Sequence, residues 1–353
     1  MSEGIPQSSC VRKIERIERG VCAIDIGSES LFVAVAEEPV KRFGTFTSEI
    51  ILLGEYLQSA GIERVAMEAT GVYWIPLHDH LCKCGFEVTV FHGAHARNLP
   101  GRKTDVSDCQ WHAMLHSHGL LSPCFIPPAA ILELRCLYRL REDQVGLGAM
   151  YVQQMQKALI LMNVRLHDVI SQINGVSGLR VIEAIVGGER DPQKLTELCS
   201  GQILKRKRDQ VVASLQGSWE KHHVFALSQA LQGYRFCQSQ MAACDGQIER
   251  WLLESTKEMD TKPPQAVSKM RHNAPQIEDL HGKLVTLCQG RDAAILPGIS
   301  PLGFMKLVGE LGTDLSRWPS EKHFTAWLGL APGRLRQTAP ACGAPQDGSR
   351  TNF

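Results

Sequence analysis

The chain has 353 residues, of which 44% are hydrophobic and 21% charged, and its formal net charge at pH 7 is +1. These values are ordinary for a soluble globular protein of two or three domains, and they exclude an overall positive field that would attract nucleic acid. The polar segment 1–19 has no apolar core and is not expected to be a signal peptide, and no apolar run of about 18 residues predicts a membrane span. The 12 scattered cysteines suggest reduced thiols in the cytoplasm.

After the polar extension 1–19, the region 20–125 is predicted to be an α/β domain. Ser48 is the expected N-cap of its first helix. Three strands followed by strand–helix alternation are typical of this fold class. The expected elements are strands at Val21–Ile26, Ser30–Ala36 and Arg42–Phe46, a helix at Ser48–Ser59, a strand at Arg64–Glu68, a helix at Trp74–Cys84 and a strand at Phe86–Phe91.

The region 129–260 loses the strand pattern, and its apolar residues recur every few positions as in long helices. This spacing predicts a helical arm, either a hairpin or a coiled coil, whose second long helix is expected at about Val211–Ser255. Residues 261–276 are rich in Pro, Lys and Gln and are predicted to be a linker. We expect a small, mainly α carboxyl-terminal domain over 277–353.

Four acidic residues carry the chemistry that the sequence indicates. Asp25 and Glu68 each end an apolar strand, and Asp105 and Asp108 share one face of a predicted helix. Each fragment alone is also explained by a turn, a solvated strand end or a helix cap. Together, the four carboxylates could hold hard divalent cations, Mg²⁺ or Mn²⁺, which activate an attacking oxygen in phosphodiester chemistry. We therefore predict that these side chains converge in an RNase H-like sheet.

Several other residues have two interpretations. The basic groups Arg97, Arg102 and Lys103, and Lys205, Arg206, Lys207 and Arg208, are candidates for phosphate contacts, although the second group fits a solvated helix face equally well. The turn Leu296–Pro301 could present backbone N–H groups to phosphate or serve packing alone. His112 and His116 lack the Glu of a metalloprotease motif and are predicted to lie on the surface.

The chain resembles the DEDD-type, RuvC-like insertion-sequence transposases, whose members act as bridge-RNA-guided DNA recombinases. The resemblance rests on five short motifs in the right order: Ala23–Gly27, Met67–Gly71, Lys103–Asp108, Leu296–Ile299 and Trp327–Pro332. It implies a RuvC-like RNase H fold in which Asp25, Glu68, Asp105 and Asp108 are catalytic and bind magnesium. It also implies a coiled-coil arm used for dimerisation, DNA and a guide RNA as partners, and a nucleoid-associated bacterial location.

The resemblance further implies a nucleophilic serine in the carboxyl-terminal domain, within a Ser-Gly-Gly-like segment. Here Gly333–Pro340 stands in that place, and only Thr338 offers a hydroxyl near the expected position. We therefore expect a truncated or frameshifted carboxyl terminus. The expected protein is a transposase for DNA transposition and recombination, or an inactive nucleic-acid-binding remnant of one. An actin-like ATPase or sugar kinase is disfavoured because the chain has no second Asp-Gly-rich phosphate loop.

Overall fold

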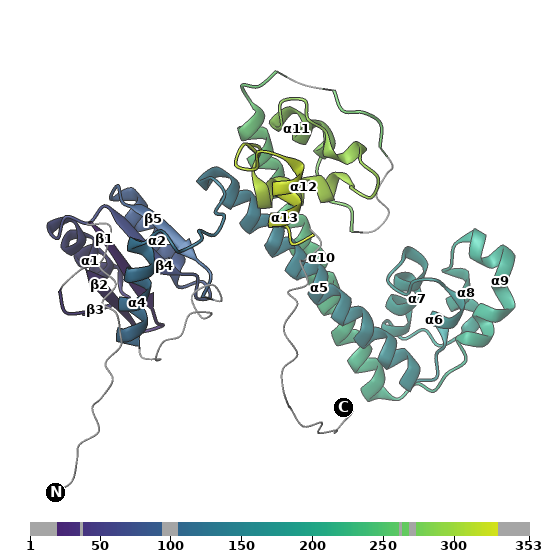
Figure 1. Cartoon of the computed structure of the whole chain (residues 1–353). Helices are drawn as coiled ribbons and strands as arrows, with labels where there is room; N and C mark the ends of the chain where they lie inside the picture. The colour runs from purple at the N-terminus through teal and green to yellow at the C-terminus, as the bar shows by residue number, and fades with distance from the viewer. Residues whose placement is uncertain (1–19, 36–37, 94–104, 261–262, 268–272, 331–353) are drawn as a thin grey trace, which may run out of the picture. The chain divides into compact units, whose positions relative to one another are not determined.

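The computed structural model describes residues 20–35, 38–93, 105–260, 263–267 and 273–330 (Figure 1). The chain divides into two compact units, Met1–Ile126 and Pro127–Phe353. Within the described ranges, no helix is long and apolar enough to cross a membrane. The cysteines in these ranges are all free thiols.

The first unit is built on a mixed five-stranded sheet. Its strands are β1 (Val21–Ile26), β2 (Ser30–Val35), β3 (Lys41–Gly44), β4 (Arg64–Glu68) and β5 (Glu87–Phe91), in the order β3-β2-β1-β4-β5. The strands β1, β2 and β3 form an antiparallel meander, and β4 and β5 extend the sheet in parallel with β1. This α/β arrangement fits the predicted RNase H-like domain.

Helices cover both faces of this sheet, and the side chains of the strands differ between the two faces. Large apolar residues such as Ile24 and Met67 face α1 (Thr47–Ser59) and α2 (Trp74–Lys83). Small residues face α4 (Asp105–Ser117), among them Ala23, Ala34 and Ala66. Because these side chains are short, α4 lies close to the strands, and the Cys109 thiol donates to the carbonyl oxygens of Ala23 (3.2 Å) and Phe32 (2.9 Å).

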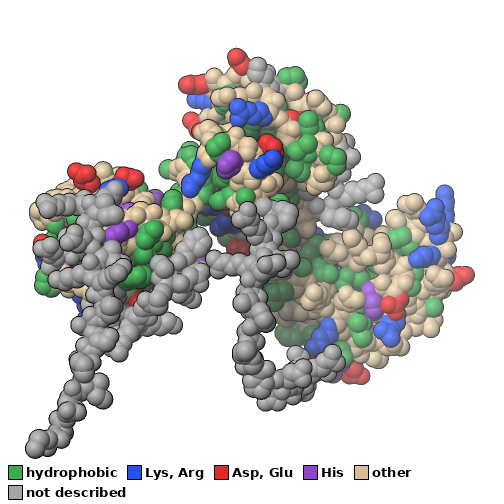
Figure 2. Space-filling view, viewed as in Figure 1, with side chains coloured by type: hydrophobic (Ala, Val, Ile, Leu, Met, Phe, Trp, Pro, Cys, Tyr) green, Lys and Arg blue, Asp and Glu red, His purple; other side chains and the backbone are tan. Residues whose placement is uncertain are grey.

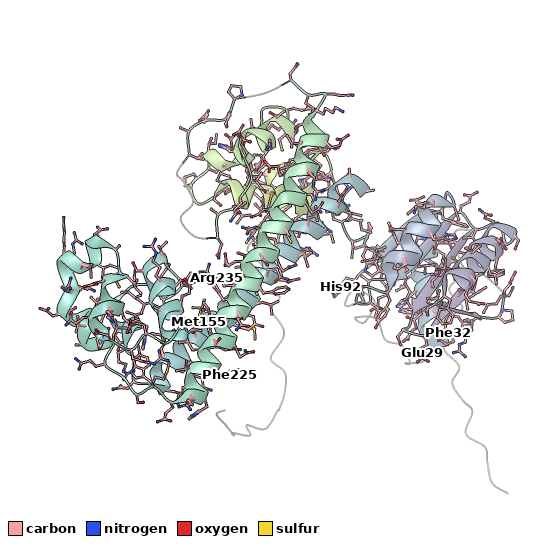
Figure 3. The ribbon with its side chains drawn as sticks, turned by 180° about the vertical axis from the view of Figure 1, so that it is seen from behind. Glu29, Phe32, His92, Met155, Phe225 and Arg235 are labelled. Atoms are coloured by element: carbon pink, nitrogen blue, oxygen red, sulfur yellow. The ribbon has the colours of Figure 1, made fainter. Side chains whose placement is uncertain are left out.

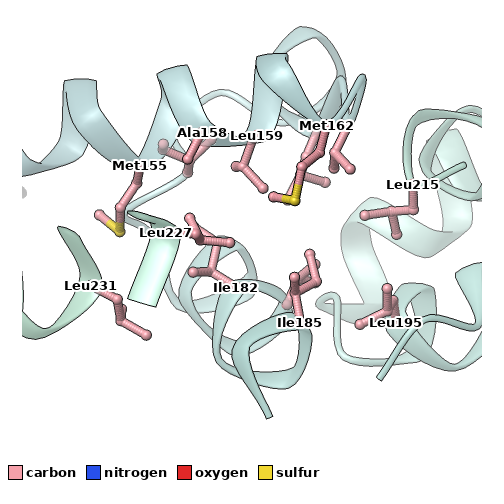
Figure 4. Packing of buried hydrophobic residues seen from close by; sticks show 14 of the residues in the cluster. Met155, Ala158, Leu159, Met162, Ile182, Ile185, Leu195, Leu215, Leu227 and Leu231 are labelled. Atoms are coloured by element: carbon pink, nitrogen blue, oxygen red, sulfur yellow. The ribbon is translucent and has the colours of Figure 1, made fainter. Parts of the chain in front are cut away.

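In the second unit, two long helices run antiparallel along each other: α5 (Ala129–Leu161) and α10 (Lys221–Thr256). Four shorter helices connect them: α6 (Leu166–Val169), α7 (Val176–Val186), α8 (Pro192–Glu197) and α9 (Gly201–Ser214). Met155, Ile182 and Leu227 come from three different helices and meet in the core at this end (Figure 4). Arg235, labelled on α10 in Figure 3, forms an ion pair with Glu183 of α7.

The carboxyl-terminal helices α11 (Leu280–Leu287) and α12 (Pro301–Leu311) pack against the other end of this pair. A 3₁₀ turn η1 (Ala293–Ile295) precedes α12, and α13 (Glu321–Trp327) follows it. Glu310 at the end of α12 accepts hydrogen bonds from Tyr138 and Arg139 of α5, and also forms an ion pair with Arg135. A buried apolar cluster joins α5, α10, α11 and α12.

Two predicted helix boundaries are wrong. The helix α1 begins at Thr47 with Phe46 as its N-cap, so Ser48 lies inside its first turn. The predicted helix Val211–Ser255 is broken, because α9 ends at Ser214 and α10 begins only at Lys221. The chain turns here around the end of α5: the N–H of Ser218 donates to the carbonyl oxygen of Met162 (2.8 Å), and a Cβ atom at Gly217 would collide with that carbonyl.

Candidate active site

Asp25 and Glu68 lie at the ends of neighbouring strands. The strands β1 and β4 are parallel, and Ile24 pairs with Met67. One further step along each strand places Asp25 beside Glu68 at the carboxyl edge of the sheet. An alanine that packs against α4 stands two positions before each residue: Ala23 before Asp25, and Ala66 before Glu68. Because side chains alternate between the two faces of a strand, both carboxylates point to the α4 side.

The helix α4 brings Asp108 to the same side of the sheet. Asp108 directly precedes Cys109, whose thiol bonds to β1 and β2, so the first turn of α4 lies over these strands. Burial raises the pKa of the Cys109 thiol to about 12, and the nearby Asp25 carboxylate also opposes its ionisation. Asp105 is the first residue of α4, and its side chain is outside the described structure.

His112 lies one turn beyond Asp108 and is only 5% exposed, and His116 is 8% exposed, so the prediction of surface histidines is wrong. The reason is that this face of α4 is packed on the sheet, where the His112 ring stands edge-on to Phe91 at 4.8 Å between ring centroids. Burial lowers the pKa of His112, and the charges of Glu68 and Asp108 act in the opposite direction. Glu68 and Asp108 are therefore both close enough to His112 to affect the pKa of its buried imidazole.

Gly93 is a further residue of this site that sequence reasoning missed. It stands two residues after the end of β5 in the sequence, and a Cβ atom at Gly93 would collide with the carboxylate of Glu68. A side chain at this position would therefore displace Glu68 from the sheet edge. The sequence holds no signal for this contact, because the two residues meet only through the pairing of β4 with β5.

The chemistry of these donors fits a hard divalent cation. Asp25, Glu68 and Asp108 offer carboxylate oxygens, the ligands that Mg²⁺ and Mn²⁺ prefer. The Cys109 thiol stays protonated at neutral pH, so it is no competing thiolate ligand. Among the side chains that are described, no three His, Cys, Asp or Glu residues are already arranged to hold a metal ion.

The predicted basic contacts are described only in part. Arg97, Arg102 and Lys103 lie outside the described residues, as does Thr338. Lys205, Arg206, Lys207 and Arg208 are exposed on α9 in the second unit, where Figure 2 shows Lys and Arg side chains gathered at the outer edge. The Lys207 ammonium donates to the carbonyl oxygen of Val169 (3.0 Å), and Arg208 lies 3.9 Å from a carboxylate oxygen of Glu197.

The turn Leu296–Pro301 leads directly into α12. Pro301 is the first residue of that helix, and the Ser300 hydroxyl accepts a hydrogen bond from the N–H of Gly303 (3.1 Å). With Gln265–Val267, the turn lines a pocket of about 580 Å³. The side chain of Ser300 thus already caps α12, and phosphate binding by this turn stays a prediction.

Two family models match the chain. Residues 22–163 match a model of DEDD transposases of IS110 elements, described as "Transposase", and residues 293–338 match a model described as "Transposase IS116/IS110/IS902 family". The first match contains all four acidic residues, and the second contains the turn before α12 and all of α12 and α13. No curated protein matches the chain.

Proposed function

Because this chain belongs to the DEDD-type transposases of the IS110 family, we propose that it recombines the DNA of an insertion element through metal-assisted phosphodiester chemistry. The observation that carries this proposal is the placement of Asp25 and Glu68 side by side on parallel strands, facing the helix that bears Asp105 and Asp108. Bound Mg²⁺ or Mn²⁺ would supply activation of an attacking oxygen and stabilisation of a leaving one. The rigid strand ends would hold the carboxylates, and the buried ring of His112 would close one side of the site to water.

The experiment that tests this function is a DNA cleavage assay with the full chain, the ends of its own element and the proposed guide RNA. We expect strand cleavage with Mg²⁺ or Mn²⁺ and none after chelation, because both reacting oxygens need a neutralising cation. Cleavage that continues unchanged in excess chelator would contradict the proposed chemistry. Nucleic-acid binding without cleavage under any metal would favour the inactive remnant instead.

Gly93→Ala tests whether Glu68 takes part in metal binding. The added Cβ atom collides with the Glu68 carboxylate, so that carboxylate must leave its present position. We expect Mn²⁺ to bind the full chain at least about tenfold more weakly, as for the loss of groups that orient metal ligands. Gly146→Ala on α5 is the control, since a Cβ atom there meets open space. Equal Mn²⁺ affinity in the two variants would remove Glu68 from the ligand set.

The DNA and the guide RNA would contact basic side chains, and α9 offers a surface for one of them. Lys205 and Arg206 have no ion pair among the described residues, whereas Lys207 and Arg208 already have partners. Neutralising Lys205 and Arg206 together by Gln should flatten the plot of log affinity against log salt concentration by about two units, one for each phosphate contact. The matched pair Lys207→Gln and Arg208→Gln should change the slope less. Identical slopes in both double variants and the unchanged chain would make this cluster a solvated helix face.

We also propose a homo-oligomer through the long helices. Leu140, Leu147 and Met150 on α5 are 48%, 43% and 55% exposed, and their spacing places them along one side of the helix. Burial of such a stripe against a second copy would remove this apolar surface from water. We expect the chain to sediment as a dimer at about ten micromolar. Leu147→Glu should raise the dissociation constant at least about tenfold, whereas Ala149→Glu, exposed on the same helix but off the stripe, should not. A monomeric unchanged chain would contradict the proposal.

A further inference from the structure

A polar pocket of about 350 Å³ lies in the second unit, where the middle of the α5–α10 pair meets the segment before α7 and residues 273–276. It is lined by polar side chains from these elements, including Arg141, Asn174, Tyr234, Gln238, Asp245 and Gln276. This volume falls within the range of small-molecule sites. None of the four acidic residues of the candidate active site lines it.

Arg141 brings an unsatisfied hydrogen-bond donor to this pocket. Its side chain is 1% exposed, its Nε donates to Oδ1 of Asp245 (2.6 Å), and its Nη2 donates to the carbonyl oxygen of Asn273 (2.9 Å). Its buried Nη1 has no hydrogen-bond partner among the described residues. A buried donor without a partner is destabilising, more so when it is charged, and an acceptor atom entering the pocket would satisfy it.

The remaining donors favour an oxyanion over a cation. The helix α7 has 11 residues, and its N-cap Gly175 provides no side-chain hydrogen bond, so the first N–H groups beside the pocket are available. Among the described residues that line the pocket, Asp245 is the acidic one. Its two carboxylate oxygens already accept hydrogen bonds, one from Arg141 and one from the N–H of Gln276 (2.9 Å). A negatively charged ligand would therefore meet donors and no unpaired carboxylate.

We propose that this pocket binds a phosphate group, with Nη1 of Arg141 and the first N–H groups of α7 as donors. The shared chemistry is a phosphate ester oxygen, and its source is either a free nucleotide or the phosphodiester backbone of a nucleic-acid strand. Tetrahedral phosphate oxygens accept several hydrogen bonds at once from guanidinium and helix N-terminal donors. The side-chain amides of Asn174 and Gln238 would contact the rest of the ligand.

The test compares two neighbouring positions on α10 in the full chain. Ala242 lines the pocket, so Ala242→Phe fills it and leaves the side chains of Arg141 and Asp245 in the sequence, whereas Ala243 is exposed and outside the lining, so Ala243→Phe is the matched control. Titration calorimetry measures the binding of adenosine monophosphate and of an oligothymidylate that lacks terminal phosphates. We expect Ala242→Phe to weaken binding of one probe at least about tenfold, and Ala243→Phe to leave it unchanged.

The two probes identify the source of the phosphate. A selective loss of adenosine monophosphate binding in Ala242→Phe indicates a free phosphate ester, and a selective loss of oligothymidylate binding indicates a strand backbone. Arg141→Lys keeps a cation beside Asp245 and removes Nη1, so it should lose the same probe, and it decides the matter if Ala242→Phe fails to fold. The proposal is wrong if the unchanged chain binds neither probe, or if both probes bind Ala242→Phe and Ala243→Phe equally.

Discussion

Asp25→Asn is expected to lower DNA strand cleavage at least about a thousandfold while the first unit stays folded. The proposed site neutralises two reacting oxygens through carboxylate-held metal ions, and a loss of about 4 kcal/mol of transition-state stabilisation corresponds to this factor. Asn has nearly the same shape as Asp, so the strand β1 and its pairing with β2 and β4 should persist. The measurement is the single-turnover cleavage rate with Mg²⁺, together with the circular dichroism spectrum of the variant.

The control for this prediction is Glu29→Gln. Glu29 is exposed in the turn between β1 and β2, close in sequence to Asp25, and is labelled in Figure 3. Both variants remove one negative charge from the same unit, so a general effect on DNA binding would appear in both. A cleavage rate of Asp25→Asn within about tenfold of the Glu29→Gln rate would remove Asp25 from the proposed chemistry.

Sequence patterns predicted the strands of the first unit because apolar runs bounded by turn residues need only local information. Val21–Ile26 and Arg64–Glu68 agree residue by residue with β1 and β4. The end of each run also indicated Asp25 and Glu68 as candidates, since a charged residue at the end of a buried apolar run is unusual. Whether the four carboxylates share a metal ion stays a prediction.

The contacts that sequence reasoning missed depend on chain segments that meet only in the fold. Gly93 lies against the carboxylate of Glu68 because β4 pairs with β5. His112 is buried because α4 packs on the face of the sheet that carries small side chains. For His112, the sequence did offer one indication: it stands four residues after Asp108, a spacing that puts the two side chains on the same face of a helix. The break between α9 and α10 was missed because the apolar spacing resumes after it, while the turn itself is fixed by contact with Met162.

Asp245→Leu is expected to destabilise the second unit by about 3–5 kcal/mol, because it leaves the guanidinium of Arg141 buried without its counter-charge. The side chains of Arg141 and Asp245 are 1% and 2% exposed, and Asp245 also accepts a hydrogen bond from the N–H of Gln276. The measurement is the free energy of unfolding by denaturant, followed through the helical circular dichroism signal. Asp168→Leu is the control, since its pair with Arg165 spans 4.0 Å between exposed side chains, and such pairs contribute about 0–1 kcal/mol.

The double variant Arg141→Leu with Asp245→Leu separates the cost of an unpaired charge from the loss of the pair itself. Replacement of a whole buried ion pair by apolar side chains is often neutral or stabilising, so the double variant should recover most of the stability lost in Asp245→Leu. A double variant as unstable as Asp245→Leu would show that other contacts dominate, such as the bonds to Asn273 and Gln276. An Asp245→Leu variant no less stable than Asp168→Leu would mean that Arg141 finds another partner or reaches water. Because Arg141 joins α5 to α10 and to residues 273–276, this pair is expected to stabilise the junction that leads into the carboxyl-terminal helices.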